Sequence, residues 1–150
     1  MFRIRTLVPP SAMALDGSTA LGELVIGQAH LHFALDLRAW RVADYEHQWK
    51  SGLMRLVRGA ESSVLMMKYR GIGHAPHMMW ALWREAEHVY VQPHCVLPSD
   101  LNAPFDPAFP YEHVGTRIPA TEQSLPLEEW RVDLVQLIAS AMHIRWPFGQ

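Results

Sequence analysis

The chain has 150 residues, of which 49% are hydrophobic and 19% charged, and its formal net charge is −2. This length and composition are typical of one globular domain with its own core, and they exclude an intrinsically disordered chain. With 13 Lys and Arg against 15 Asp and Glu, the chain has no overall positive field that would attract nucleic acid. We therefore expect a single domain over residues 1–150.

The N-terminal part predicts two strands. Over Phe2–Val8 apolar side chains alternate with arginines, which is typical of a half-buried strand, and Pro9 and Pro10 would end it. Leu21–Leu37 is rich in apolar residues that partly alternate with polar ones. We interpret this second segment as one long or bent strand, with Gly27 as a candidate bulge.

The segment Val42–Val57 predicts an amphipathic helix and is the clearest element of the chain. Its apolar side chains recur at helical spacing, at Tyr45, Trp49, Leu53, Leu56 and Val57. Asp44 is the expected N-cap and Gly59 the expected C-cap. We expect the apolar stripe of this helix to pack in the core.

Three strands are expected after the helix, over Ser62–Tyr69, His77–Arg84 and His88–Val96. The short connections between them favour an antiparallel meander. Pro93 in the third strand indicates an edge position or a bulge, because proline has no N–H to donate to a neighbouring strand.

The C-terminal part combines a long loop with a short strand and a helix. Leu97–Thr121 contains five prolines and little periodicity, which predicts an ordered surface loop, and loops of this length are usually functional or disordered. Apolar residues alternate at Trp130, Val132 and Leu134, which predicts a short strand, and Leu134–Met142 predicts the final helix. The side chains of this helix expected to point inward are Leu134, Leu137, Ile138, Ala141 and Met142.

Together these elements predict an α+β fold, in which an antiparallel β-sheet of about five or six strands packs against one main amphipathic helix and a C-terminal helix. No apolar run approaches the ~20 residues that cross a bilayer, and the N-terminus lacks the apolar core of a signal peptide. We therefore expect a cytoplasmic protein with no membrane partner. Cys95 is the only cysteine, which excludes an internal disulfide and agrees with a reducing compartment. We expect its side chain to be a small buried hydrophobic group.

The charges are divided unevenly along the chain. Residues 1–75 hold nine basic and six acidic side chains, whereas residues 76–150 hold four and nine. Within Ser99–Asp133 seven carboxylates are accompanied only by Arg117 and Arg131. A local acidic region suits a basic partner rather than DNA or RNA, although a solvated acidic loop has the same composition.

Nine histidines invite a metal or acid–base hypothesis. His30 and His32 would share one face of a strand, which is a workable geometry for metal ligands, but no further ligand is indicated and no zinc pattern is present. No nucleotide or dinucleotide motif occurs either. We expect no metal, cofactor or small-molecule ligand. Two alternatives stay open. One is a small metal-free hydrolase or nuclease that uses His30, His32 or His113 with a carboxylate. The other is a homo-oligomeric scaffold protein that uses an exposed face of Trp and Met side chains.

Several short blocks of the sequence resemble one family. DYEHQWKSGLMRL, over Asp44–Leu56, resembles the "DYxxQWxxGLxRL" helix of immunity proteins from bacterial contact-dependent growth inhibition (CDI) systems, the CdiI type. Further blocks agree in order and spacing along roughly residues 23–134, and they are Val89–Gln92, Phe105–Pro107, Pro110–Tyr111, His113–Gly115, Arg117 and Glu129–Val132. None of these blocks is a chemical motif.

The resemblance implies a small cytoplasmic protein, not an enzyme, that binds and neutralises the C-terminal toxin domain of a cognate CdiA-type effector. Such toxins are often nucleases with basic clefts, and the acidic Ser99–Asp133 region would fit such a cleft. We expect a 1:1 complex in which acidic side chains pair with basic groups of the toxin and aromatic side chains act as anchors. The candidate toxin-binding residues are Asp100, Asp106, Glu112, Glu128 and Glu129, with Phe105, Phe109 and Tyr111.

Overall fold

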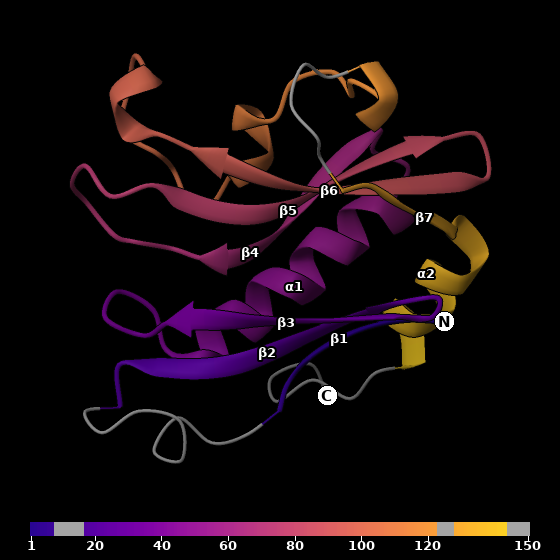
Figure 1. Ribbon diagram of the computed structural model, residues 1–150, viewed down its shortest axis with the longest axis horizontal. Coiled ribbons are helices and arrows are strands. Elements are labelled where there is room, and N and C mark those ends of the chain that lie inside the picture. The colour runs from indigo at the N-terminus through magenta and orange to yellow at the C-terminus, as the bar shows by residue number, and fades with distance from the viewer. Residues whose placement is uncertain (8–16, 123–127, 144–150) are drawn as a thin grey trace.

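The computed structural model describes residues 1–7, 17–122 and 128–143 and contains two antiparallel sheets (Figure 1). The first sheet has the order β1-β2-β3, with β1 at Phe2–Thr6, β2 at Thr19–Ile26 and β3 at Ala29–Asp36. The second has the order β4-β5-β6-β7, with β4 at Ser62–Lys68, β5 at His77–Glu85, β6 at His88–Val96 and β7 at Trp130–Asp133. Helix α1, Val42–Val57, connects the two sheets, and α2, Leu134–His143, follows β7.

The predicted α+β fold is confirmed, with antiparallel strands, one main amphipathic helix and a C-terminal helix. The strands differ from the expectation in that they form two sheets rather than one of about five or six strands. Figure 1 shows α1 running behind β3 and β4, where the two sheets lie next to each other. Side chains of α1 hydrogen-bond to the open edge of β4, and β3 and β4 belong to different sheets.

The segment expected to be one long strand is a hairpin. β2 and β3 pair in register from Thr19↔Asp36 to Ile26↔Ala29, which leaves Gly27 and Gln28 as a two-residue turn. Gly27 has φ 58°, the left-handed region that glycine adopts without steric cost. Gly27 is therefore the first residue of a turn, and the predicted bulge is wrong.

Helix α1 has the predicted bounds, but its first turn is capped differently. The N-cap is Arg41, and Asp44 is the third helical residue, whose Oδ2 accepts a hydrogen bond of 2.9 Å from the backbone N–H of Arg41. Asp44 thus closes the capping box from inside the helix, so its assignment as N-cap is corrected. The C-cap is Arg58 rather than the expected Gly59, which follows it with φ 102° in the left-handed region and ends the helix.

Side chains of α1 satisfy the open edge of β4. Gln48 Nε2 donates to the carbonyl of Val64 at 3.0 Å, and Gln48 Oε1 accepts from the backbone N–H of Met66 at 2.7 Å. Trp49 Nε1 donates to the carbonyl of Met66 at 2.8 Å, and Arg55 Nε to that of Ser62 at 2.9 Å. These bonds supply the partners that a neighbouring strand would otherwise provide.

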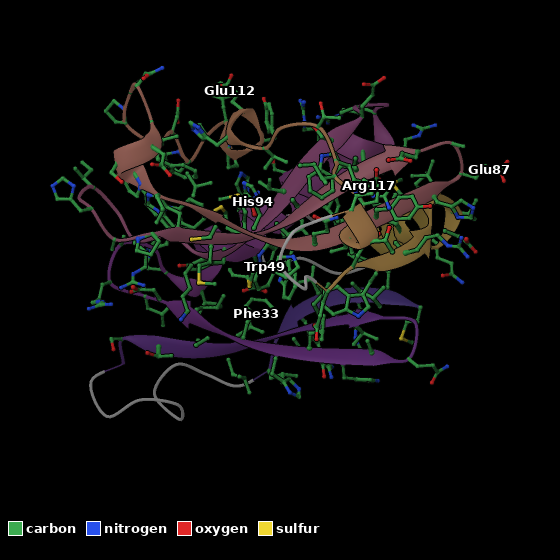
Figure 2. All side chains as sticks on the ribbon, turned by 45° about the horizontal axis from the view of Figure 1, so that its top comes forward. Phe33, Trp49, Glu87, His94, Glu112 and Arg117 are labelled. Carbon is green, nitrogen blue, oxygen red and sulfur yellow. The ribbon has the colours of Figure 1, made fainter. Side chains whose placement is uncertain are left out.

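The core lies between the two sheets and α1. Phe33 of β3 makes edge-to-face contacts with Trp49 of α1 and Trp80 of β5, with ring centroids 6.1 and 5.9 Å apart, and Figure 2 shows Phe33 beside Trp49 in the interior. In α2 Leu134, Leu137 and Ala141 are buried and Ile138 is partly buried, whereas Met142 is exposed, which corrects its predicted inward position. No helix in the described residues is both long and apolar enough to span a membrane.

Candidate functional site

The segment from Pro98 to Glu122 covers the face of the β4–β7 sheet that points away from the β1–β3 sheet (Figure 1). It contains three short 3₁₀ helices, at Pro98–Asp100, Pro110–His113 and Ala120–Glu122. Side chains of the sheet hold its backbone, because Trp83 Nε1 donates to the carbonyl of Gly115 at 2.8 Å and Gln92 Nε2 donates to that of Ile118 at 2.9 Å. The predicted ordered surface loop is thus present and is fixed to the sheet.

A stack of aromatic rings attaches the middle of this segment. Phe105 lies between His77, with ring centroids 4.2 Å apart, and His113, at 4.9 Å, and His77 stacks in turn on Tyr69 at 5.2 Å. His77 is 1% exposed, and its Nδ1 accepts a hydrogen bond from the backbone N–H of Arg70. Burial, together with the nearby charges of Arg70 and His113, lowers the pKa of His77, so the ring is neutral near pH 7.

A second attachment joins Arg117 to Glu129. The Nε and Nη2 atoms of Arg117 donate to the two oxygens of Glu129 at 2.8 and 2.7 Å, and Nη1 donates to Glu85 at 3.0 Å. Gln92 Nε2 also donates to Glu129, at 2.6 Å. The hydrogen bonds from Arg117 are the main cause that lowers the pKa of Glu129, against its partial burial. The Arg117 side chain is only 11% exposed.

The eight candidate toxin-binding residues divide into two groups. Asp100, Asp106, Glu112 and Glu128 are exposed, and Phe109, also exposed, lies beside the half-buried Tyr111. Phe105 belongs to the aromatic stack, and the carboxylate of Glu129 is already paired within the chain. Four carboxylates and two aromatic rings are therefore available at the surface.

Phe109 and Tyr111 form one wall of a groove of about 710 Å³ between the segment and helix α1. Arg55 lies at the boundary of the two walls, since its guanidinium carbon is 3.5 Å from the centroid of the Tyr111 ring. Asp106 and Glu112 flank the wall residues Pro107–Tyr111 in the chain.

The opposite wall of this groove is a stripe of α1 that the sequence analysis did not assign to any site. Asp44, His47, Ser51, Arg55 and Arg58 line it, at the three- and four-residue spacing of one helical face. The stripe is basic overall because its two arginines outnumber its one carboxylate, Asp44, which also pairs with the Arg41 guanidinium at 3.8 Å. The only signal in the sequence is that these polar positions lie opposite the apolar stripe.

The histidines considered for catalysis lie in two separate places. His30 and His32 are on β3, 3.6 and 3.4 Å from Glu23, whose carboxylate also pairs with Arg5 at 3.0 Å and Arg3 at 3.6 Å. Burial alone raises the pKa of Glu23, but the hydrogen bonds and charge of Arg5 and the two histidines lower it overall. A carboxylate held ionised in this way is an ion-pair partner rather than a poised acid or base.

His113 and Cys95 show no activated nucleophile or metal site. His113 stacks on Phe105, and its Nε2 is buried without a hydrogen-bond partner among the described residues. Cys95 is exposed, which corrects its expected burial, because it lies near the end of β6 beside the half-buried Met78, at the margin of the core. No group of three or more His, Cys, Asp or Glu that could hold a metal ion occurs in the part of the chain that the structure describes.

Comparisons with known proteins place this fold in a family. A family model described as the CdiI N-terminal domain matches residues 35–140. Among solved structures, the chain is similar to a chain of the "CdiA-CT/CdiI toxin and immunity complex from Enterobacter cloacae", with a TM-score of 0.81 and 22% sequence identity. The similarity covers 95% of this chain and 97% of that chain, so the two share one fold over nearly their whole length. A comparison with proteins of curated function gives no match.

Proposed function

The chain belongs to the CdiI N-terminal domain family, because the family model matches more than half of it, and we propose on this basis that it is a CDI immunity protein. It binds the C-terminal toxin domain of a cognate CdiA-type effector, as one copy per toxin domain, in the cytoplasm of the cell that it protects. The similar solved structure is a complex of a CdiA-CT toxin with a CdiI immunity protein, which supports this role.

The proposed binding surface is inferred from the exposed acidic side chains of the Pro98–Glu122 segment. Asp100, Asp106 and Glu112 project from a segment that the sheet holds at several points, so their positions are fixed before a partner arrives. Asp106 is fixed further, because its Oδ1 accepts a hydrogen bond of 2.9 Å from the backbone N–H of Ala108. Glu128 adds a fourth exposed carboxylate.

Such a surface fits a basic cleft, and we propose that the toxin is a nuclease whose active site this surface blocks. Phosphate-binding clefts are rich in Lys and Arg, so opposed charges steer the encounter and raise its rate. Phe109, 46% exposed, and Tyr111 supply aromatic anchors of the kind that dominate the energetics of interfaces. A total buried area of about 1,600 Å² is sufficient for nanomolar or tighter binding.

The remaining two candidates support the surface from below. Phe105 keeps the segment on the sheet through His77 and His113, and Glu129 keeps it there through Arg117 and Gln92. Replacing either residue therefore weakens toxin binding through movement of the segment rather than through a lost contact with the toxin.

Growth protection tests the immunity role. Cells that produce the toxin domain encoded immediately upstream of this chain should stop growing, and production of this chain from a second plasmid should restore growth. A toxin domain from an unrelated CDI system is the matched control, against which no protection is expected. Failure to protect against the cognate toxin, with both proteins present in the cell, would exclude the proposed role.

Charge reversal tests the acidic surface. Asp106→Lys combined with Glu112→Lys is expected to slow association at least tenfold and to reduce its dependence on salt concentration. Glu87→Lys is the matched control, since Glu87 is exposed on the β5–β6 turn, distant from Glu112 in Figure 2. Equal association rates for the double variant and the control would place the interface elsewhere on the protein.

A further inference from the structure

The groove beside α1 has a charge opposite to that of the segment that borders it. Its ionisable lining consists of Asp44, His47, Arg55 and Arg58, and Asp44 is already engaged by the Arg41 backbone. Two guanidinium groups, one carboxylate and one imidazole therefore line a space of about 710 Å³, which gives the groove a net positive charge in a chain whose net charge is −2. The adjoining Asp106 and Glu112 are exposed and acidic.

Of the two arginines, Arg58 is the one available to a partner. Arg55 donates to the carbonyl of Ser62 and lies over the ring of Tyr111, so it is committed to the fold. Arg58 is exposed at the end of α1, and no ion pair or side-chain hydrogen bond to another described residue occupies it. The backbone N–H of Arg58 donates to the carbonyl of Met54, so the last turn of α1 fixes the backbone from which the side chain extends.

The other lining groups restrict what can enter. Trp40, Phe109, Pro110 and Tyr111 give the groove an apolar wall, and Ser51 leaves room for a side chain on the helix side. An apolar wall opposite a guanidinium group is suited to an apolar side chain with a carboxylate next to it. A basic or purely polar segment would leave Arg58 facing like charge or would leave the aromatic wall unpaired.

We propose that this groove is a second part of the toxin-binding surface and takes a segment of the toxin that carries a carboxylate beside an apolar side chain. This inference rests on the proposed immunity function. The interface then has both signs of charge: Asp106 and Glu112 pair with Lys or Arg of the toxin, and Arg58 pairs with an Asp, a Glu or a terminal carboxylate. An alternating pattern of this kind selects one toxin over others, because a uniformly basic toxin surface meets repulsion at Arg58.

Whether Arg58→Glu strengthens or weakens binding of the toxin domain tests the inference. If the toxin surface over the groove is basic, Arg58→Glu adds a favourable charge and strengthens binding. If the groove takes a carboxylate, Arg58→Glu weakens binding of the purified toxin domain by tenfold or more, and Arg58→Ser weakens it by less. Arg131→Glu is the matched control, because Arg131 is an exposed arginine on β7 that does not line the groove.

A steric variant gives an independent measurement. Ser51→Trp fills the groove from the exposed side of α1 without changing its charge, and it is expected to weaken binding of the toxin domain by tenfold or more. Thermal unfolding of each variant verifies that the fold is retained. Unchanged or tighter binding by Arg58→Glu and unchanged binding by Ser51→Trp would overturn the inference and leave the immunity role intact. A wild-type protein that does not bind the toxin would overturn both.

Discussion

The side chain of Gln48 holds the backbone of Met66 through a hydrogen bond of 2.7 Å, which joins helix α1 to the open edge of β4. The same amide donates to Val64, so one glutamine satisfies two consecutive edge groups. Gln48 belongs to the helix motif on which the family resemblance rests. Its neighbour Tyr45 acts likewise, since its hydroxyl donates to the carbonyl of Asp36 and accepts from the backbone N–H of Tyr69. These residues of the motif therefore join the two sheets through α1. Their contacts are within the fold and indicate a structural role rather than a role in toxin recognition.

Replacing Gln48 by alanine is expected to destabilise the protein by about 2–4 kcal/mol, because two buried backbone groups lose their partners. Urea unfolding measures this as a lower midpoint with an unchanged slope. Ser51→Ala, one turn along on the exposed side of α1, is the control and should change the free energy of unfolding by less than about 0.5 kcal/mol. A similar midpoint for both variants would mean that the edge of β4 does not depend on this amide.

Replacing Gly52 by alanine tests how closely α1 approaches β4. A Cβ at this position would lie against the carbonyl of Val64, a backbone atom that cannot move aside on its own. Although alanine favours a helix over glycine by about 1 kcal/mol, we expect a net loss of about 1–3 kcal/mol of stability. Gly115→Ala, where a Cβ meets no atom within 4 Å, should be nearly neutral. Stabilisation by Gly52→Ala would show that the helix lies farther from the strand.

The helix was predictable from the sequence because its apolar stripe, its acidic start and its terminal glycine all act within a few residues. The bounds Val42–Val57 agree with those predicted. The β2–β3 hairpin was missed because Gly27-Gln28 is a weak turn signal inside a continuous apolar run. A single glycine is equally compatible with a bulge and with a turn, and only the pairing of the strands distinguishes the two.

The composition of the candidate site was predictable from the sequence, but its geometry was not. Exposure of Asp106 and Glu112 follows from a proline-rich loop. The pairing of Glu129 with Arg117 depends on how the segments that contain them meet on the sheet, and this cannot be inferred from the local sequence. In the sequence Arg58 is only a charge favourable to the helix dipole, because the groove that it lines also depends on the Pro107–Tyr111 wall.

The His77 ring is expected to make stability depend on pH. Because burial lowers its pKa in the folded state, its stabilising effect is complete above the unfolded pKa of about 6.5 and is lost as pH falls below that value. Arg70 and His113 oppose its protonation, and the rings of Tyr69 and Phe105 both stack against it. The free energy of unfolding should therefore decrease between pH 7 and pH 5.

Histidine variants identify the source of that decrease. His77→Gln should unfold more easily at pH 7 and show a smaller loss between pH 7 and pH 5, because glutamine does not titrate. His74→Gln, on the exposed turn before β5, should keep the wild-type pH profile. If the wild type and His77→Gln share the same profile, the titrating group is a different one.

Removing Arg117 is expected to destabilise the protein most where Glu129 is ionised. Glu129 has a lowered pKa in the folded state, so its contribution is present above the unfolded pKa of about 4.3 and is lost as pH falls through the folded value. Arg117→Met should cost about 2 kcal/mol at pH 7 and clearly less near pH 3. Arg131→Met, at an exposed position on β7, is the control. An equal cost at both pH values would show that Arg117 acts through packing, for example on the ring of Tyr90.

Calorimetric titration of this protein into the cognate CdiA-type toxin domain is the decisive measurement of the proposed immunity role. We expect one binding event with a stoichiometry of one, a nanomolar or lower Kd, and loss of toxin activity in the same mixture. Absence of binding to a correctly folded and active toxin domain would contradict the immunity role.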